Sequence, residues 1–199
     1  MALAYAMKVK VKDCGFYVTN YAEYLENYAS DWEVDLKPVS SWSCFHGVGR
    51  WCEDCGCSTG GHPGWNQKWR EPLRDALDYL RDEMAALYKK IGKKYFLNPD
   101  EARNNYINVI LDRSDSNVIS FQEEYFQPDL DEKQKVEAME LMEIQRQAML
   151  MYTSCGWFFS EISGIETTQI MKYAARAMQL AGDFTDKNLE EEFLRILYH

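Results

Sequence analysis

From residue 67 onward, apolar side chains recur every three or four positions, which is the spacing of one face of an α-helix. The first such stripe comprises Trp69, Leu73, Leu77, Leu80, Met84, Leu87 and Ile91. Gly92 follows the stripe and predicts the end of this helix. Pro99 predicts the start of the next helix, because proline suits a first turn. The inward side chains of that helix would be Ala102, Tyr106, Val109 and Ile110.

Further helices are predicted over residues 118–126, 131–152, 165–181 and 187–198. Pro128 separates the first two of them. The apolar side of the long helix 131–152 would comprise Val136, Met139, Met142, Ala148 and Met149. Methionine is a common core-filling residue, so this group predicts packing rather than chemistry. The segment 152–164 interrupts the helical periodicity.

The front of the chain has a different pattern. Residues 8–12 (KVKVK), 16–18 (FYV) and 32–36 (WEVDL) predict short strands, and the last alternates apolar and acidic residues with period two. Between them, Asn20 and Glu23 fit an N-cap and its capping-box partner for a helix through about residue 27. The chain is therefore predicted to be mainly α. It would comprise a small αβ segment (1–36), a long ordered Cys/Trp-rich loop (37–66) and a helical bundle (67–199).

Composition and charge narrow the class of protein. The 199 residues are 46% hydrophobic and 14% aromatic, which is typical of a folded domain. The formal net charge of -10 argues against a nucleic-acid or anionic-membrane surface. No apolar run approaches the ~20 residues that span a bilayer. The N-terminus turns charged at Lys8 and lacks a signal-peptide core, so we expect a cytoplasmic protein whose cysteines are reduced thiols or metal ligands.

The loop carries a group of metal-ligand residues. Cys44-x-His46 and Cys55-x-Cys57 would offer a zinc ion the four thiolate or imidazole ligands that it prefers. Cys52 and His62 lie close enough in the sequence to substitute. The spacing differs from that of zinc fingers and ribbons. The alternative interpretation is that these small polar residues pack a tight glycine-rich turn.

The same loop is rich in indoles and polar side chains. Trp42, Trp51, Trp65 and Trp69 occur near Arg50, Asp54, His46 and Asn66. Indole faces match the apolar faces of sugar rings, and the polar side chains match sugar hydroxyls. The alternative is that the indoles fasten the loop to the helices, Trp69 first, because it begins the apolar stripe.

Two segments resemble the signatures of a known family. Residues 41–51, 54–57 and 64–70 read SWSCFHGVGRW, DCGC and GWNQKWR, and residues 152–159 and 162–166 read YTSCGWFF and ISGIE. They resemble a branch of family 57 of the glycoside hydrolases, in the C-terminal region classed as a domain of unknown function of the 3536 type. The likeness covers nearly the whole chain.

The resemblance implies a helical domain that follows a (β/α) barrel and lines the cleft of an α-glucan hydrolase or transferase. A barrel alone needs roughly 200 residues, so we expect the catalytic carboxylates upstream and this chain alone to be inactive. The uncapped last helix likewise predicts a piece of a longer protein. The expected partners are that barrel and an α-glucan oligosaccharide. The expected substrate-binding residues are Trp42, His46, Arg50, Trp51, Asp54, Trp65, Asn66, Trp157 and Glu166.

Two other functions stay open. The chain could be a structural or protein-interaction module, stapled by zinc, with no substrate contact. It could also be a stand-alone enzyme that uses Asp54, Glu161 and Glu166. The last is the least favoured, because two carboxylates five residues apart on a helix point to different faces.

Overall fold

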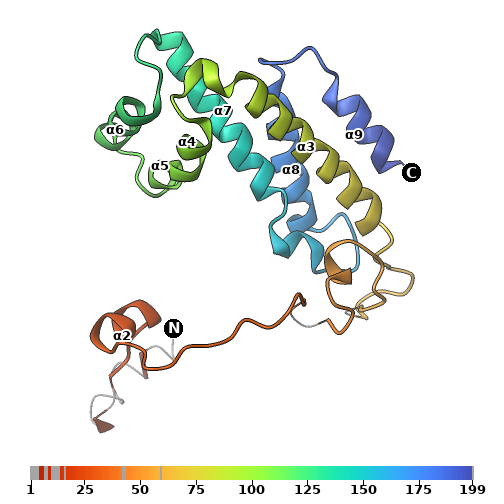
Figure 1. Ribbon diagram of the computed structural model, residues 1–199. Helices are drawn as coiled ribbons and strands as arrows, with labels where there is room; N and C mark the ends of the chain where they lie inside the picture. Colours follow the sequence, from red (N-terminus) through yellow and green to blue (C-terminus); the bar gives the residue numbers. More distant parts are fainter. Residues whose placement is uncertain are drawn as a thin grey trace. The chain divides into compact units, whose positions relative to one another are not determined.

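The computed structural model describes residues 5–6, 9, 14–15, 17–41, 44–58 and 60–198. It divides into two compact units, Met1–Pro38 and Val39–His199, and each is described by itself. Figure 1 shows both units as ribbons. Among the described residues, no helix has both the length and the apolar character needed to cross a lipid bilayer.

The described residues of the first unit include the short helix α2 (Tyr21–Asn27). The side chain of Asn20 accepts a hydrogen bond from the backbone N–H of Glu23 at 3.0 Å, which confirms the predicted N-cap. The carboxylate of Glu23 accepts hydrogen bonds from the hydroxyls of Tyr17 at 2.7 Å and Thr19 at 2.9 Å. The helix start is therefore tied to the residues that precede it.

The predicted strands of the front segment are not shown. Of residues 8–12 only Val9 is described, and it is helical; Tyr17 and Val18 lie in neither helix nor strand. Residues 32–36 are likewise irregular, and Trp32 is 87% exposed. Alternating polarity stabilises a strand only where a neighbouring strand supplies backbone partners. The described part of this unit contains no such partner.

The second unit is a helical bundle. Its helices are α3 (Arg70–Tyr95), α4 (Pro99–Asn105), α5 (Ile107–Leu111), α6 (Asp115–Tyr125), α7 (Glu132–Leu150), α8 (Ile165–Ala181) and α9 (Leu189–Leu197). Two 3₁₀ turns, η2 (Gly49–Trp51) and η3 (Ser154–Trp157), lie in the loops. The helices α3, α7 and α8 lie side by side, and α9 packs on α3 (Figure 1). The Cys/Trp-rich loop and the group α4–α6 lie at opposite ends of α3.

The core confirms the predicted stripe of α3. Leu73, Leu77, Leu80 and Met84 are completely buried. The same core includes two small buried residues of α8, Ala174 and Ala177. Burying each large apolar side chain contributes about 1.5–3 kcal/mol, so this seam is a main source of stability.

The predicted end of the first helix at Gly92 is wrong. The helix continues to Tyr95, and Gly92 is buried inside it. A Cβ atom at Gly92 would lie 3.2 Å from the Cβ atom of Pro99. The glycine therefore lets the first residue of α4 approach closely, and its role here is packing rather than termination.

Two predicted core residues of α7 are exposed. Val136 is 58% exposed and Met149 is 75% exposed. The buried face consists of Ala138, Leu141, Met142, Ile144 and Ala148. This face is displaced from the predicted one because α7 packs between α3 and α8 and buries the residues that face both. Asp131 and Gln134 begin the helix with a complete capping box.

The contrast between two methionines of α7 gives the first prediction. Met142 is 1% exposed, so Met142→Ala should lower the free energy of unfolding by about 2–5 kcal/mol, because it removes packed atoms and leaves a cavity. Met149→Ala should change it by less than about 0.5 kcal/mol. Denaturant unfolding of both variants measures this, and equal losses would contradict the assignment of the buried face.

Candidate metal centre

Four side chains of the loop converge on one point. They are Cys44, His46, Cys55 and Cys57, and their ligand atoms all lie within 4.8 Å of one another. The sulfur atoms of Cys44 and Cys57 are 3.8 Å apart. The Nδ1 atom of His46 lies 3.6 Å from the Cys44 sulfur and 3.5 Å from the Cys57 sulfur. The structure thus brings together all four residues that the sequence predicted as ligands.

These separations can be compared with those of a tetrahedral zinc site. With Zn–S bonds of about 2.3 Å and a Zn–N bond of about 2.0–2.1 Å, tetrahedral angles place two sulfurs about 3.8 Å apart and a sulfur and nitrogen about 3.5 Å apart. The three distances above agree with these values. The four side chains could therefore hold a metal ion.

The backbone of the loop explains how distant residues reach this point. Gly56, between two of the cysteines, has a φ of 72°, a left-handed conformation that other residues rarely adopt. Its N–H donates to the side chain of Asp54 at 3.3 Å. On the other side, Ser41 and Cys44 form an antiparallel bridge, and the Ser41 hydroxyl donates to the carbonyl of Gly47.

The surroundings shift the pKa values of two of the thiols, Cys55 and Cys57, in opposite directions. Burial acts to raise the pKa of Cys55, but hydrogen bonds from the Cys57 backbone and the Arg70 guanidinium outweigh it and lower that pKa. Burial and the neighbouring sulfurs of Cys44 and Cys55 raise the pKa of Cys57. The thiolate form is thus favoured more at Cys55 than at Cys57.

Polar side chains join the loop to the segment that follows α7. Arg50, 5% exposed, donates to the carbonyl of Phe158 at 3.1 Å. Gln67, 1% exposed, donates to the carbonyl of Cys57 at 2.8 Å and to the Ser160 hydroxyl at 3.2 Å. The metal cluster is therefore hydrogen-bonded to a segment about 100 residues later in the chain.

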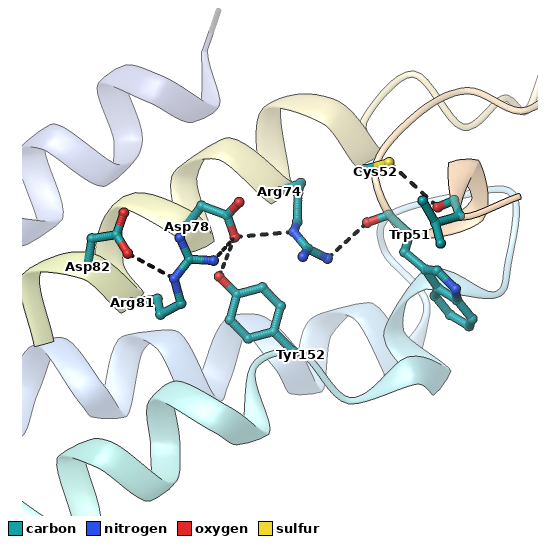
Figure 2. A network of polar contacts seen from close by, with 8 residues as sticks. Trp51, Cys52, Arg74, Asp78, Arg81, Asp82 and Tyr152 are labelled. Carbon is teal, nitrogen blue, oxygen red and sulfur yellow. Dashed lines mark hydrogen bonds and ion pairs between the residues drawn. The ribbon is translucent and has the colours of Figure 1, made fainter. Parts of the chain in front are cut away.

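A second polar network, drawn in Figure 2, joins the loop to α3. The Asp78 carboxylate accepts hydrogen bonds from Arg74 at 3.2 Å, Arg81 at 3.0 Å and the Tyr152 hydroxyl at 2.5 Å. Arg74 also donates to the carbonyl of Trp51 at 3.3 Å. Burial, and then the hydrogen bond to Asp78, raise the pKa of Tyr152, so its hydroxyl remains a donor at neutral pH.

Some of the predicted sugar-contacting residues lie at the surface of the loop. Trp65 is 46% exposed, and its ring packs on His62 with a centroid distance of 4.2 Å. Asn66 and Asp54 are exposed, and both accept backbone hydrogen bonds within the loop. His46 is exposed within the metal cluster. Their roles toward a sugar stay predictions.

Other residues that were predicted to contact a sugar are buried or partly buried within the domain. Trp157 is 1% exposed and stacks on Trp69 at 6.1 Å between centroids, so it serves the core. Trp51 is partly buried against the same core. Arg50 is buried against Phe158, and Trp42 lies outside the described residues.

Glu166 lies apart from the metal cluster. It lines a separate cavity of about 260 Å³ with residues of η3 and α8, including Thr153, Cys155 and Tyr173. The structure therefore does not place Glu166 beside the ligands or beside the exposed indole of Trp65.

Sequence reasoning missed the residues that connect the loop to the bundle, above all Arg70 and Asp78. Arg70 is completely buried, although a charged residue at the start of a helix is usually solvated. The signal that could have found them is the run Arg70, Arg74, Asp78 and Arg81, whose spacing puts charge on the face of α3 nearest the loop.

The comparisons with known proteins concern mainly the helices. A family model described as Domain of unknown function (DUF3536) matches residues 65–199. The matched range contains α3 to α9, and the four metal-ligand residues precede it. No curated protein and no solved structure matches the chain.

The network around Asp78 predicts that the hydroxyl of Tyr152 contributes measurably to the free energy of unfolding. Tyr152→Phe removes the donor to a carboxylate and should lower the free energy of unfolding by about 1–2 kcal/mol. Tyr198→Phe, at an 85% exposed tyrosine, is the control and should change it by less than about 0.5 kcal/mol. If chemical denaturation finds the two variants equally stable, the contact between Tyr152 and Asp78 contributes nothing.

Proposed function

We propose that this chain, which belongs to the DUF3536 family, is a helical domain whose Cys/Trp-rich loop is cross-linked by a structural zinc ion. The ligands would be Cys44, His46, Cys55 and Cys57. The single observation that supports this proposal is the convergence of the four donors, with the three separations among Cys44, His46 and Cys57 in agreement with those of a zinc tetrahedron.

The kind of donor favours zinc and a structural role. Three thiolates and an imidazole are soft to borderline ligands, which suit zinc better than magnesium or calcium. Four protein ligands complete a tetrahedron and leave no position for a substrate or a reactive water. Such an ion would supply cross-linking rather than chemistry.

The loop needs such a cross-link because it lacks a core of its own. Its residues 44–66 are mostly exposed, and Phe45, between two of the ligands, is fully exposed. Apolar burial therefore contributes little to its order. A bound ion would join the turn around Cys44 to the turn around Gly56, and binding free energy would become folding free energy.

The third prediction is one equivalent of zinc in protein purified without affinity-tag metal. Cys57→Ser should abolish stoichiometric binding, because it removes a ligand. Cys52→Ser should retain it, because the Cys52 thiol is directed to the carbonyl of Val48 at 3.5 Å and is outside the cluster. Inductively coupled plasma mass spectrometry of dialysed samples measures the zinc-to-protein ratio.

Two results would decide against this proposal. The first is wild-type protein that contains no zinc and takes up none from a buffered zinc solution under reducing conditions. The second is an equal loss of zinc in Cys52→Ser and Cys57→Ser, which would assign the metal to another set of ligands.

A second candidate function is that the loop forms one wall of the substrate cleft of an α-glucan-active enzyme. The resemblance to the family 57 signatures supports it, together with the exposed indole of Trp65 beside His62 and Asn66. An indole face with polar neighbours suits a sugar ring. In this proposal the catalytic carboxylates belong to the upstream barrel, and zinc keeps the wall rigid.

The fourth prediction tests this second function. Trp65→Ala should weaken binding of maltooligosaccharides to the full-length protein about tenfold or more, because it removes a stacking surface. Trp32→Ala removes an 87% exposed indole outside the loop and should leave binding unchanged. Isothermal titration calorimetry measures both, and unchanged affinity in Trp65→Ala would remove Trp65 from the proposed cleft.

A further inference from the structure

A buried arginine lies beside the metal cluster. Arg70 is the first residue of α3 and is completely buried. Its Nη1 donates to the sulfur of Cys55 at 3.3 Å, and its Nη2 donates to the carbonyl of Phe159 at 3.4 Å. Within the described residues its Nε atom is buried and makes no hydrogen bond. The side chain thus turns back from the helix toward the loop.

A guanidinium in this position needs a negative partner. Removing a charged group from water costs several kcal/mol unless an opposite charge and hydrogen bonds compensate. Among the described residues, no carboxylate forms an ion pair with Arg70. The charge of Asp54 attracts it and the charge of Arg50 repels it. Of the groups that Arg70 contacts within the described residues, the one that can carry a negative charge is the sulfur of Cys55.

The charge of the proposed zinc site matches this requirement. Three thiolates and a neutral imidazole carry a charge of -3, and Zn²⁺ brings the total to -1. One adjacent guanidinium neutralises that remainder. Hydrogen bonds to metal-bound ligands are known to orient the ligands and to tune the metal.

We infer that Arg70 is the positioning residue of this metal site. It holds the Cys55 sulfur in place, balances the excess negative charge of the zinc–thiolate group and joins that group to the carbonyl of Phe159. This inference rests on the proposed zinc site. It adds that metal binding and the order of residues 158–160 are coupled, because one side chain donates to both.

The chain offers a matched control one turn further along α3. Arg74 also donates to a loop carbonyl, that of Trp51 at 3.3 Å, but within the described part of the chain its hydrogen bonds go to oxygen atoms and not to a sulfur. A substitution there disturbs the attachment of the loop and leaves the metal cluster alone. Comparing the two arginines separates an effect on the metal from an effect on loop attachment.

The fifth prediction concerns zinc affinity in the full chain. Arg70→Met should weaken zinc binding about 10–100-fold, as is typical when an outer partner of a metal ligand is removed. Arg74→Met should change the affinity less than about twofold. Arg70→Lys keeps the charge but loses the planar fork, so it should recover part of the loss. Competition with a chromophoric chelator at fixed pH measures each constant.

A spectroscopic readout tests the contact with sulfur directly. In the Co²⁺-loaded protein, loss of an N–H···S hydrogen bond makes the thiolate a better electron donor. The thiolate-to-metal charge-transfer band of Arg70→Met should therefore move to longer wavelength, and that of Arg74→Met should not. A purely structural role of Arg70 would not move this band.

The possible results separate the two proposals. If wild-type protein binds zinc stoichiometrically while Arg70→Met and Arg70→Lys keep wild-type affinity and an unshifted cobalt band, the role of Arg70 is wrong and the zinc site stands. Equal losses in Arg70→Met and Arg74→Met also overturn it, because the effect would then be loop attachment. If wild-type protein binds no zinc, both proposals fail.

Discussion

A guanidinium buried at the start of α3 donates to a sulfur in a cluster of sulfur and nitrogen donors, and in our proposal this pairing holds the loop in order. The described part of the loop is mostly exposed, so apolar burial beyond the partly buried Trp51 contributes little to its order. Its other attachments are polar. Arg50 of the loop donates to the carbonyl of Phe158, Arg74 of α3 donates to the carbonyl of Trp51 in the loop, and Arg70 of α3 donates to the sulfur of Cys55. In our proposal the zinc ion closes the loop, and the arginines fix its position on the bundle.

The helical part of the fold could be predicted from the sequence because its signals are local. The stripe of α3, the proline that begins α4 and the bounds of α8 all follow from spacing and first-turn chemistry. Features set by neighbouring elements could not be predicted this way. A glycine after an apolar stripe is typical of a helix end, which is why the sequence predicts one at Gly92. The close approach of Pro99 explains why this glycine instead lies inside the helix.

The sequence predicted the four candidate ligands of the site, but not the residues that hold these ligands in position. Cys44, His46, Cys55 and Cys57 were identified from their chemistry, although their spacing matched no standard zinc motif. What brings them together is the left-handed backbone of Gly56 and the attachment of the loop to α3, neither of which is visible in the spacing. Arg70 was missed because a charged residue at the start of a helix is normally solvated. Trp157 resembles a ligand-stacking residue in the sequence but packs on Trp69 in the core.

The most direct test of the zinc proposal is X-ray absorption at the zinc edge, on protein purified under reducing conditions without added metal. It should show one zinc environment, with three sulfur neighbours at about 2.3 Å and one nitrogen neighbour at about 2.0–2.1 Å. A shell of oxygen and nitrogen neighbours without sulfur, or no zinc signal, would contradict it.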